Sequence, residues 1–179
     1  PFASPEELHL FLHDAHVKEQ NVLLDYVANH VHELHPVYQK HPNWATNKYT
    51  ADGRLNTQLW DEERLTTWFD TFMPTLELRN DTVAELMSDS ALVWITEYDF
   101  DGFRHDATKH IPMNFTRLLT AKIRAASDDH VYQIGETYGS DELIASYVGS
   151  GKVDAQFNFN LYDACLLYTS PSPRCLLYT

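Results

Sequence analysis

The sequence has few basic residues and, over most of its length, no cysteine. Its 179 residues include 13 Lys and Arg against 26 Asp and Glu, a formal net charge of -13. A surface that binds nucleic acid needs clustered basic side chains, and no such run occurs, so nucleic acid is disfavoured as a partner. No apolar run approaches the roughly 20 residues that span a bilayer, and the first residues lack the basic and apolar regions of a signal peptide. The 44% of hydrophobic residues is typical of a globular domain with a sizeable core.

The two cysteines, Cys165 and Cys175, each begin a copy of the pentapeptide CLLYT near the end of the chain. One interpretation is a Ser/Pro-rich linker between two apolar patches, pinned by a disulfide. The favoured interpretation is that CLLYTSPSPR is the translation of a sequencing-library adaptor, which would exclude residues 165–179 from the native protein. The chain also starts without Met, so a preceding segment stays open and localisation cannot be predicted from what is present.

The order of apolar and polar residues predicts alternating helices and strands on either side of one loose segment. Residues 31–80 are rich in His, Pro and Asn and are expected to form a small inserted domain with one short helix at 61–72. Residues 1–30 and 81–164 are expected to form half of an eight-stranded β/α barrel with a parallel sheet. A doubly wound open sheet is the alternative, although no glycine-rich phosphate turn follows any strand. The expected helices are 5–18, 81–98, 114–126 and 141–149, and the expected strands are 21–29, 100–107, 131–136 and 153–161.

Ionisable residues gather at the ends of three of these strands. Asp25 is followed by Asn29 and His30, the second group contains Arg104 and Asp106, and Glu136 ends the third strand. In a β/α barrel the carboxyl ends of the strands share one mouth, so Asp106 and Glu136 should lie near each other. Two carboxyl groups flanking a pocket are what glycoside hydrolysis needs, one protonated and one ionised. Acids on a solvated rim are the simpler alternative for either residue alone.

Three short blocks resemble those that mark the α-amylase family of retaining glycoside hydrolases. They are DYVANH at 25–30, GFRHDATKH at 102–110 and GE at 135–136. The resemblance implies an α/β fold, a partial (β/α)8 TIM barrel of about strands 3 to 6, with a small domain inserted after the third strand. The family's further Asp, at the end of the seventh strand, has no counterpart before the adaptor-like tail. The printed chain is therefore expected to be an inactive fragment of an enzyme.

The same resemblance implies a role for each strand-end residue. Asp106 would be the nucleophile, Glu136 the general acid and base, and Arg104 the cation that keeps Asp106 ionised. Substrate contacts would come from Asp25, His30, Lys109 and His110.

A calcium ion is also implied, with the side chain of Asn29 and the backbone carbonyl of His110 as ligands. A hard cation needs six to eight oxygens, and the inserted segment would have to supply the others. However, Thr75 stands where a calcium-binding Asp is common, which leaves calcium an open expectation. The histidines at 30, 32, 35 and 41 do not suit a tetrahedral zinc site, since no cysteine accompanies them and their spacing is poor.

The resemblance predicts cleavage of α-1,4-glucosidic bonds in starch or maltooligosaccharides, with an α-glucan as partner and neither nucleic acid nor membrane. A transglycosylase or trehalose-forming relative is the nearest alternative, because a sugar can replace water as acceptor. A non-catalytic sugar-binding or scaffold member is the alternative from another class. Secretion or a periplasmic location is suggested by the resemblance alone.

Overall fold

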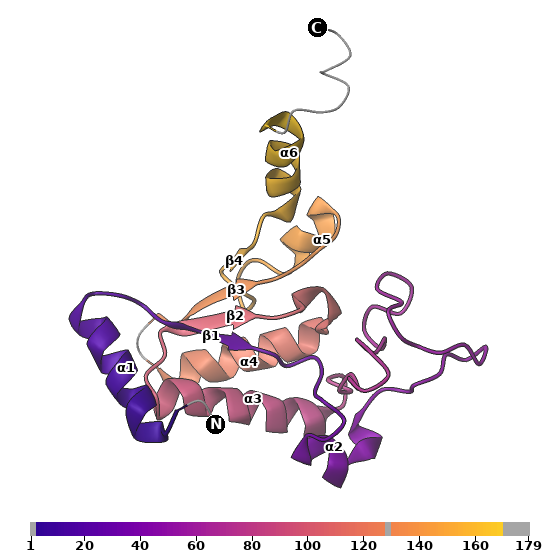
Figure 1. The fold of residues 1–179 in the computed structure, drawn as a ribbon, viewed down its shortest axis with the longest axis horizontal. Helices are drawn as coiled ribbons and strands as arrows, with labels where there is room; N and C mark the ends of the chain where they lie inside the picture. Colours follow the sequence, from indigo (N-terminus) through magenta and orange to yellow (C-terminus); the bar gives the residue numbers. More distant parts are fainter. Residues whose placement is uncertain (1–2, 128–129, 170–179) are drawn as a thin grey trace, which may run out of the picture.

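A computed structural model describes residues 3–127 and 130–169 of the chain (Figure 1). Its centre is a four-stranded parallel sheet in the order β1-β2-β3-β4. The strands are β1 (Leu23–Tyr26), β2 (Gly102–His105), β3 (Tyr132–Gly135) and β4 (Ala155–Gln156). The predicted parallel sheet of a partial β/α barrel is confirmed, and strands that follow one another along the chain are neighbours in space.

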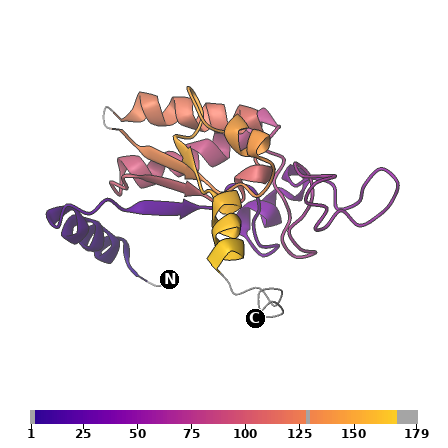
Figure 2. The ribbon, with the colours of Figure 1, turned by 90° about the horizontal axis from the view of Figure 1, so that it is seen from above.

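Two long helices, α3 (Asp81–Thr96) and α4 (Met113–Ala126), lie side by side and cover one face of the sheet (Figures 1 and 2). Asn80 caps α3, because its side-chain oxygen accepts hydrogen bonds from the backbone of Thr82 and Val83. The apolar stripes of both helices pack with the strands into one core, whose fully buried side chains include Phe103, Phe115 and Leu119.

Helix α1 (Pro5–Val17) begins at the capping box that the sequence predicts. The hydroxyl of Ser4 accepts from the backbone of Glu7, whose carboxylate accepts in turn from the backbone of Ser4. No helix in residues 3–127 and 130–169 is long and apolar enough to cross a membrane.

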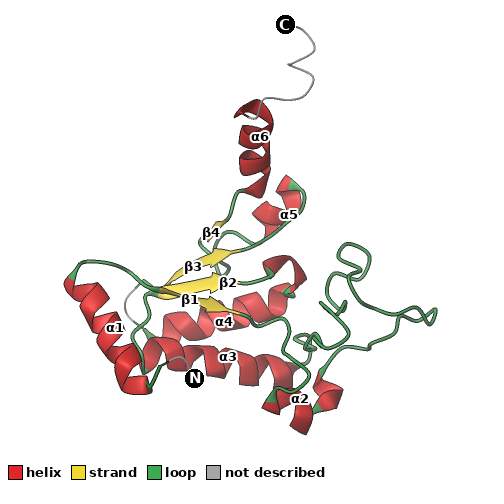
Figure 3. Ribbon diagram, in the orientation of Figure 1, coloured by secondary structure: helices red, strands yellow, loops and turns green. Residues whose placement is uncertain are grey.

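The inserted segment 31–80 leaves the sheet after β1 and returns at the start of α3. It lies beyond the carboxyl end of β1 and is mostly irregular (Figure 3). Its helices are α2 (Pro36–Lys40) and the single turn η1 (Pro42–Trp44). Antiparallel bridges from His30 to Thr75 and from Ala45 to Leu76 join its two ends.

The short helix predicted for residues 61–72 is wrong. The backbone of Trp68 instead donates to Asn56, and Thr57 and Trp68 form a parallel bridge. Trp68 is buried, and its indole donates to Thr46. Long-range contacts of this kind override a weak local helix preference.

The predicted strand at 153–161 is wrong beyond Gln156. The side chain of Asn158 accepts a hydrogen bond from the backbone of Leu161 at 2.8 Å, an arrangement that starts a helix rather than continuing a strand. Helix α6 (Phe159–Thr169) follows and extends away from the sheet (Figure 1), after the short helix α5 (Asp141–Ser146). The predicted boundary at residue 164 lies inside α6, and residues 170–179 of the predicted adaptor lie outside the described part of the chain.

Candidate active site at the carboxyl ends of the strands

Arg104 is the centre of a cluster of three carboxylates from three neighbouring strands. Its Nη1 donates to Asp25 and to Asp106, each at 2.7 Å, and its Nη2 lies 2.7 Å from Glu136. Asp25 and Arg104 are register partners in β1 and β2, while Asp106 and Glu136 follow the last residues of β2 and β3. The parallel register therefore brings together four of the predicted site residues that lie far apart in the sequence.

Burial by itself would lower the pKa of Arg104. Its hydrogen bonds to Asp106 and Asp25, with the charge of Glu136, outweigh burial, so the pKa of the guanidinium is raised. The side chains of Arg104, Asp106 and Glu136 are 24%, 23% and 23% exposed, whereas the side chain of Asp25 is 66% exposed. The cluster is therefore a permanently cationic group shared by carboxylates at the edge of solvent.

Backbone contacts between β2 and β3 place Glu136. Its N–H donates to the carbonyl of His105 and to the hydroxyl of Thr108, both at 3.0 Å, and its Oε2 accepts from the N–H of Ala107 at 3.2 Å. The preceding residue, Gly135, leaves little room for a side chain, because a Cβ there would lie 2.9 Å from the Thr108 hydroxyl and 2.4 Å from the side chain of Gln156, and these side chains would have to move. The close approach of the two strand ends thus sets the position of the Glu136 backbone, from which its carboxyl extends.

His30 and His110 meet through aromatic side chains of the inserted segment. The ring of His30 stacks on Phe69 with centroids 4.1 Å apart, and Phe69 contacts His110 edge-on at 5.1 Å. Trp60 contacts both Phe69 and His110. Burial lowers the pKa of both histidines, although the charge of Asp106 partly opposes this for His30. Both rings are therefore neutral near pH 7.

A cleft of about 480 Å³ opens beside these rings. Lys109 lines it and forms an ion pair with Asp61 of the inserted segment. Trp60, Phe69 and Tyr138 also line the cleft, so the sugar-sized space has both apolar and charged walls. Of the predicted substrate contacts, Lys109 and His110 line the cleft, whereas His30 lies behind it and stacks on Phe69. The sequence gave no role to Asp61, Phe69 or Tyr138, since nothing in their local pattern marks them.

The surroundings of Asn29 support the expected calcium ion in one respect and not in another. The Oδ1 atom of Asn29 is buried without a hydrogen-bond partner among the described residues, as a cation ligand would be. Its neighbour is the neutral hydroxyl of Thr75, which accepts from Asn29 Nδ2 at 3.5 Å and donates to the carbonyl of Thr67 at 2.6 Å. Calcium sites usually include carboxylates, and Thr75 offers none, so the ion would depend on neutral oxygens here and stays a prediction.

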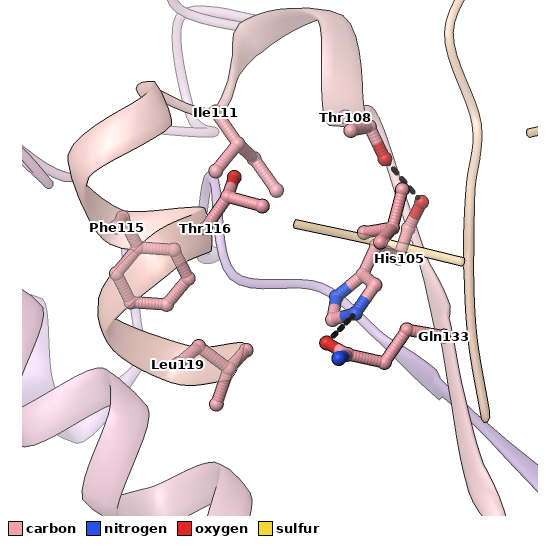
Figure 4. A pocket seen from close by; sticks show the side chains of 8 residues that line it. His105, Thr108, Ile111, Phe115, Thr116, Leu119 and Gln133 are labelled. Carbon is pink, nitrogen blue, oxygen red and sulfur yellow. Dashed lines mark hydrogen bonds between the residues drawn. The ribbon is translucent and has the colours of Figure 1, made fainter. Parts of the chain in front are cut away.

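His105, between Arg104 and Asp106 in the sequence, belongs to the core instead. Strand alternation sends its ring to the face covered by α4, where Nε2 donates to Gln133 at 3.1 Å (Figure 4). Gln133 donates in turn to Thr120 at 3.3 Å. Burial lowers the pKa of His105 to about 4. The adjoining cavity of about 10 Å³ is too small for a sugar, so it is internal packing space.

The fold and the site together define a β/α-barrel protein with a carboxylate centre at the mouth of the sheet. The profile of the family described as Alpha amylase, catalytic domain, matches residues 1–174. The chain therefore belongs to the α-amylase family.

Curated relatives agree with this assignment. Alpha-amylase 3 of Dictyoglomus thermophilum is 28% identical over 90% of this chain and 35% of its own length. A cyclomaltodextrinase of Geobacillus thermopakistaniensis is 30% identical over 93% of this chain and 29% of its own length. The chain thus spans about a third of the length of these relatives.

Solved structures show the same architecture. The α-amylase of Geobacillus thermoleovorans complexed with acarbose superposes with a TM-score of 0.78 at 28% identity, over 91% of this chain and 36% of that one. An Anoxybacillus α-amylase gives a TM-score of 0.79 at 24% identity.

Proposed function

We propose that the protein is a retaining glycoside hydrolase that cleaves α-1,4-glucosidic bonds of starch or maltooligosaccharides. The observation that carries the proposal is the single guanidinium of Arg104 in contact with Asp25, Asp106 and Glu136 at 2.7 Å each. A nucleophilic carboxylate and a second carboxyl held at one strand mouth are the minimum that retaining hydrolysis requires.

In the first step an oxygen of Asp106 attacks the anomeric carbon, and the bond from that carbon to the leaving sugar breaks. Glu136 gives its proton to the leaving oxygen. In the second step Glu136 takes a proton from water, which attacks the same carbon and releases Asp106. Arg104 holds Asp106 in place throughout, because its Nη1 donates a charge-assisted hydrogen bond to Oδ1 of that carboxylate.

Glu136 has to change partners before it can act as an acid. Its Oε2 contacts Arg104 Nη2 and the N–H of Ala107, so this oxygen is already engaged by two donors. A glycosidic oxygen bound beside Glu136 accepts its proton, so we infer that substrate draws this carboxyl away from Arg104.

The cleft supports a neutral sugar as substrate. Neutral imidazoles offer hydrogen-bonding nitrogens, Lys109 offers a donor, and the faces of Trp60 and Tyr138 suit the apolar faces of glucose rings. The names of the relatives support an α-glucan, although they include a trehalose synthase of Pimelobacter, 27% identical over 59% of this chain.

The test is hydrolysis of maltooligosaccharides by the protein expressed from its complete reading frame, beside its Asp106→Asn and Glu136→Gln variants. Each variant should lose on the order of 10⁴ in turnover. The first product released should keep the α configuration, and the two carboxyls should lie about 5 to 5.5 Å apart in a crystal structure. Turnover unchanged in Asp106→Asn would refute the mechanism, while disaccharide products without hydrolysis would favour the transglycosylase or trehalose-forming alternative.

A further inference from the structure

Three loops follow the strands that carry the charged cluster, and contacts between them set the shape of the cleft. The inserted segment follows β1, the single helical turn η2 (Thr108–His110) follows β2, and the segment that contains α5 follows β3. The cleft of about 480 Å³ takes its walls from the same three loops, with Trp60 from the insert, Lys109 from η2 and Tyr138 from the stretch before α5. Its width therefore depends on how the three loops are held together.

The side chain of Arg64 in the insert contacts both of the other loops. Its Nη1 donates to the carbonyl of Lys109 in η2 at 2.6 Å. The same nitrogen donates to the hydroxyl of Tyr147, which directly follows α5, at 3.1 Å. A charged donor makes stronger hydrogen bonds than a neutral one, so a single guanidinium fastens the insert to the loops after β2 and β3.

Tyr147 is the buried partner in this contact. It is only 1% exposed, and its hydroxyl donates to the carbonyl of Ile111 at 2.6 Å while it accepts from Arg64. Burial raises the pKa of Tyr147, although the charge of Arg64 partly opposes this, so the hydroxyl keeps its proton near pH 7. Displacing this hydroxyl would leave buried groups without hydrogen bonds, which makes the contact costly to break.

Other polar contacts join the insert to η2 without reaching α5. The carboxylate of Asp61 pairs with Nζ of Lys109, and the backbone carbonyl of Arg64 accepts from the ring of His110. Asp61 is 89% exposed, and ion pairs in water contribute little to stability. The side chains of Arg64 and Tyr147, in contrast, connect all three loops at a half-buried and a buried position.

We propose that Arg64 and Tyr147 form a joint that fixes the three loops relative to one another, and that Arg64 is thereby a positioning residue for substrate binding. The effect on substrate rests on the proposed function, whereas the joint does not. Neither side chain lines the cleft, and neither contacts the carboxylates of the cluster. Loss of the joint should therefore weaken substrate binding without removing a group that carries the chemistry.

Hydrogen–deuterium exchange tests the joint in the protein expressed from its complete reading frame. In Arg64→Gln, amide exchange should become about tenfold faster in residues 55–69, in η2 and in α5 together, because all three lose a contact that holds them. Arg54→Gln is the matched control, since Arg54 lies in the same segment but pairs with the exposed acids Asp52 and Glu62. Unchanged exchange, faster exchange confined to the insert, or an equal change in the control would overturn the joint.

Hydrolysis of maltotetraose gives the second measurement. Arg64→Gln should raise KM about tenfold and leave kcat within about twofold, because the walls of the cleft move while the carboxylates stay in place. Arg64→Lys keeps a charged donor and should recover part of the loss. A fall in kcat with KM unchanged would refute the positioning role. If the wild type hydrolyses no maltotetraose, the proposed function fails, and the exchange measurement still decides whether the joint exists.

Tyr147→Phe removes the hydroxyl and keeps the ring, so it tests the same joint should Arg64→Gln not fold. It should raise KM and speed exchange in the insert to a smaller extent, because Arg64 keeps its bond to the carbonyl of Lys109. Added to Arg64→Gln, it should change KM less than it does in the wild type, as expected for two partners of one contact. Fully additive effects, or a Tyr147→Phe protein that behaves as the wild type, would contradict the proposal.

Discussion

The sheet end and the inserted segment contribute different groups to the candidate site. At the sheet end, parallel register sets Arg104 against Asp25, and each functional residue lies on or directly after a strand. The inserted segment has little regular structure, and bridges between residues distant in sequence hold it together. The comparison teaches that the charged centre depends on the sheet, whereas the orientation of the groups around it depends on the insert.

The largest expected effect comes from removing the cation that the three carboxylates share. Arg104→Gln leaves Asp25, Asp106 and Glu136 facing one another without compensation, so protonation of one of them becomes favourable and the nucleophile is weakened. Turnover of maltooligosaccharides should fall on the order of 10³-fold. Arg79→Gln, which loses only a surface pair with Glu77, is the control. A loss below tenfold would show that the sheet end does not depend on this guanidinium.

The next largest effect is a dependence of folding stability on pH, which arises from His105 in the core. The pKa of His105 is about 4 in the folded chain, below the usual 6.5, so the unfolded chain binds the proton more tightly. Stability should therefore fall as the pH drops from about 6.5 towards 4, by roughly 3 kcal/mol from this group. Below pH 4 the folded ring is protonated as well, and this group causes no further loss.

Urea unfolding of the wild type and of His105→Gln at several pH values tests this dependence. Glutamine cannot titrate but can still donate to Gln133, so the variant should lose most of the slope. His13→Gln, at a side chain 71% exposed, should keep it. Equal slopes in all three proteins would mean that other groups govern the acid sensitivity.

A smaller effect is expected from the insert. Phe69→Leu removes the ring that stacks on His30 and contacts His110, while keeping most of the apolar volume. The loss of about 1 kcal/mol of ring contact should weaken maltotetraose binding roughly fivefold. Phe72→Leu makes a matched control, because Phe72 lies in the same segment and contacts only His32 among the ring pairs found. Affinity equal in the two variants would show that Phe69 does not order the histidines.

The sequence predicted the regular part of this molecule well, because its signals are local. The capping box at Ser4 and the apolar spacing of residues 81–98 and 114–126 each correspond to an observed helix. The placement of Asp106 and Glu136 followed from parallel strands whose carboxyl ends share one edge. Their roles stay predictions until turnover is measured.

The insert could not be predicted in the same way. Arg64 lies in a stretch with the composition of a helix, and its partners Lys109 and Tyr147 are 45 and 83 residues away. Neither contact leaves a periodic pattern. The error at residues 157–161 has a different cause, since the alternating aromatic residues there suggest a strand while the cap at Asn158 starts a helix.

The last prediction is that calcium leaves the melting temperature of the wild type unchanged. It concerns the junction of the sheet end and the inserted segment. Asn29 and Thr75 contact each other where β1 passes into the insert, and both offer only neutral oxygens. Addition of calcium or of a chelator should therefore shift the melting temperature of the wild type by less than about 1 °C.

Thr75→Asp supplies a carboxylate beside Asn29, whose Oδ1 has no hydrogen-bond partner among the described residues. Because Thr75 is buried, the new charge should destabilise the metal-free variant by a few kcal/mol, and calcium should restore part of that stability. Thr71→Asp, at an exposed position of the same segment, should not respond to calcium. A calcium-dependent rise in the melting temperature of the wild type would mean that Asn29 and the His110 carbonyl do hold the ion with ligands other than Thr75.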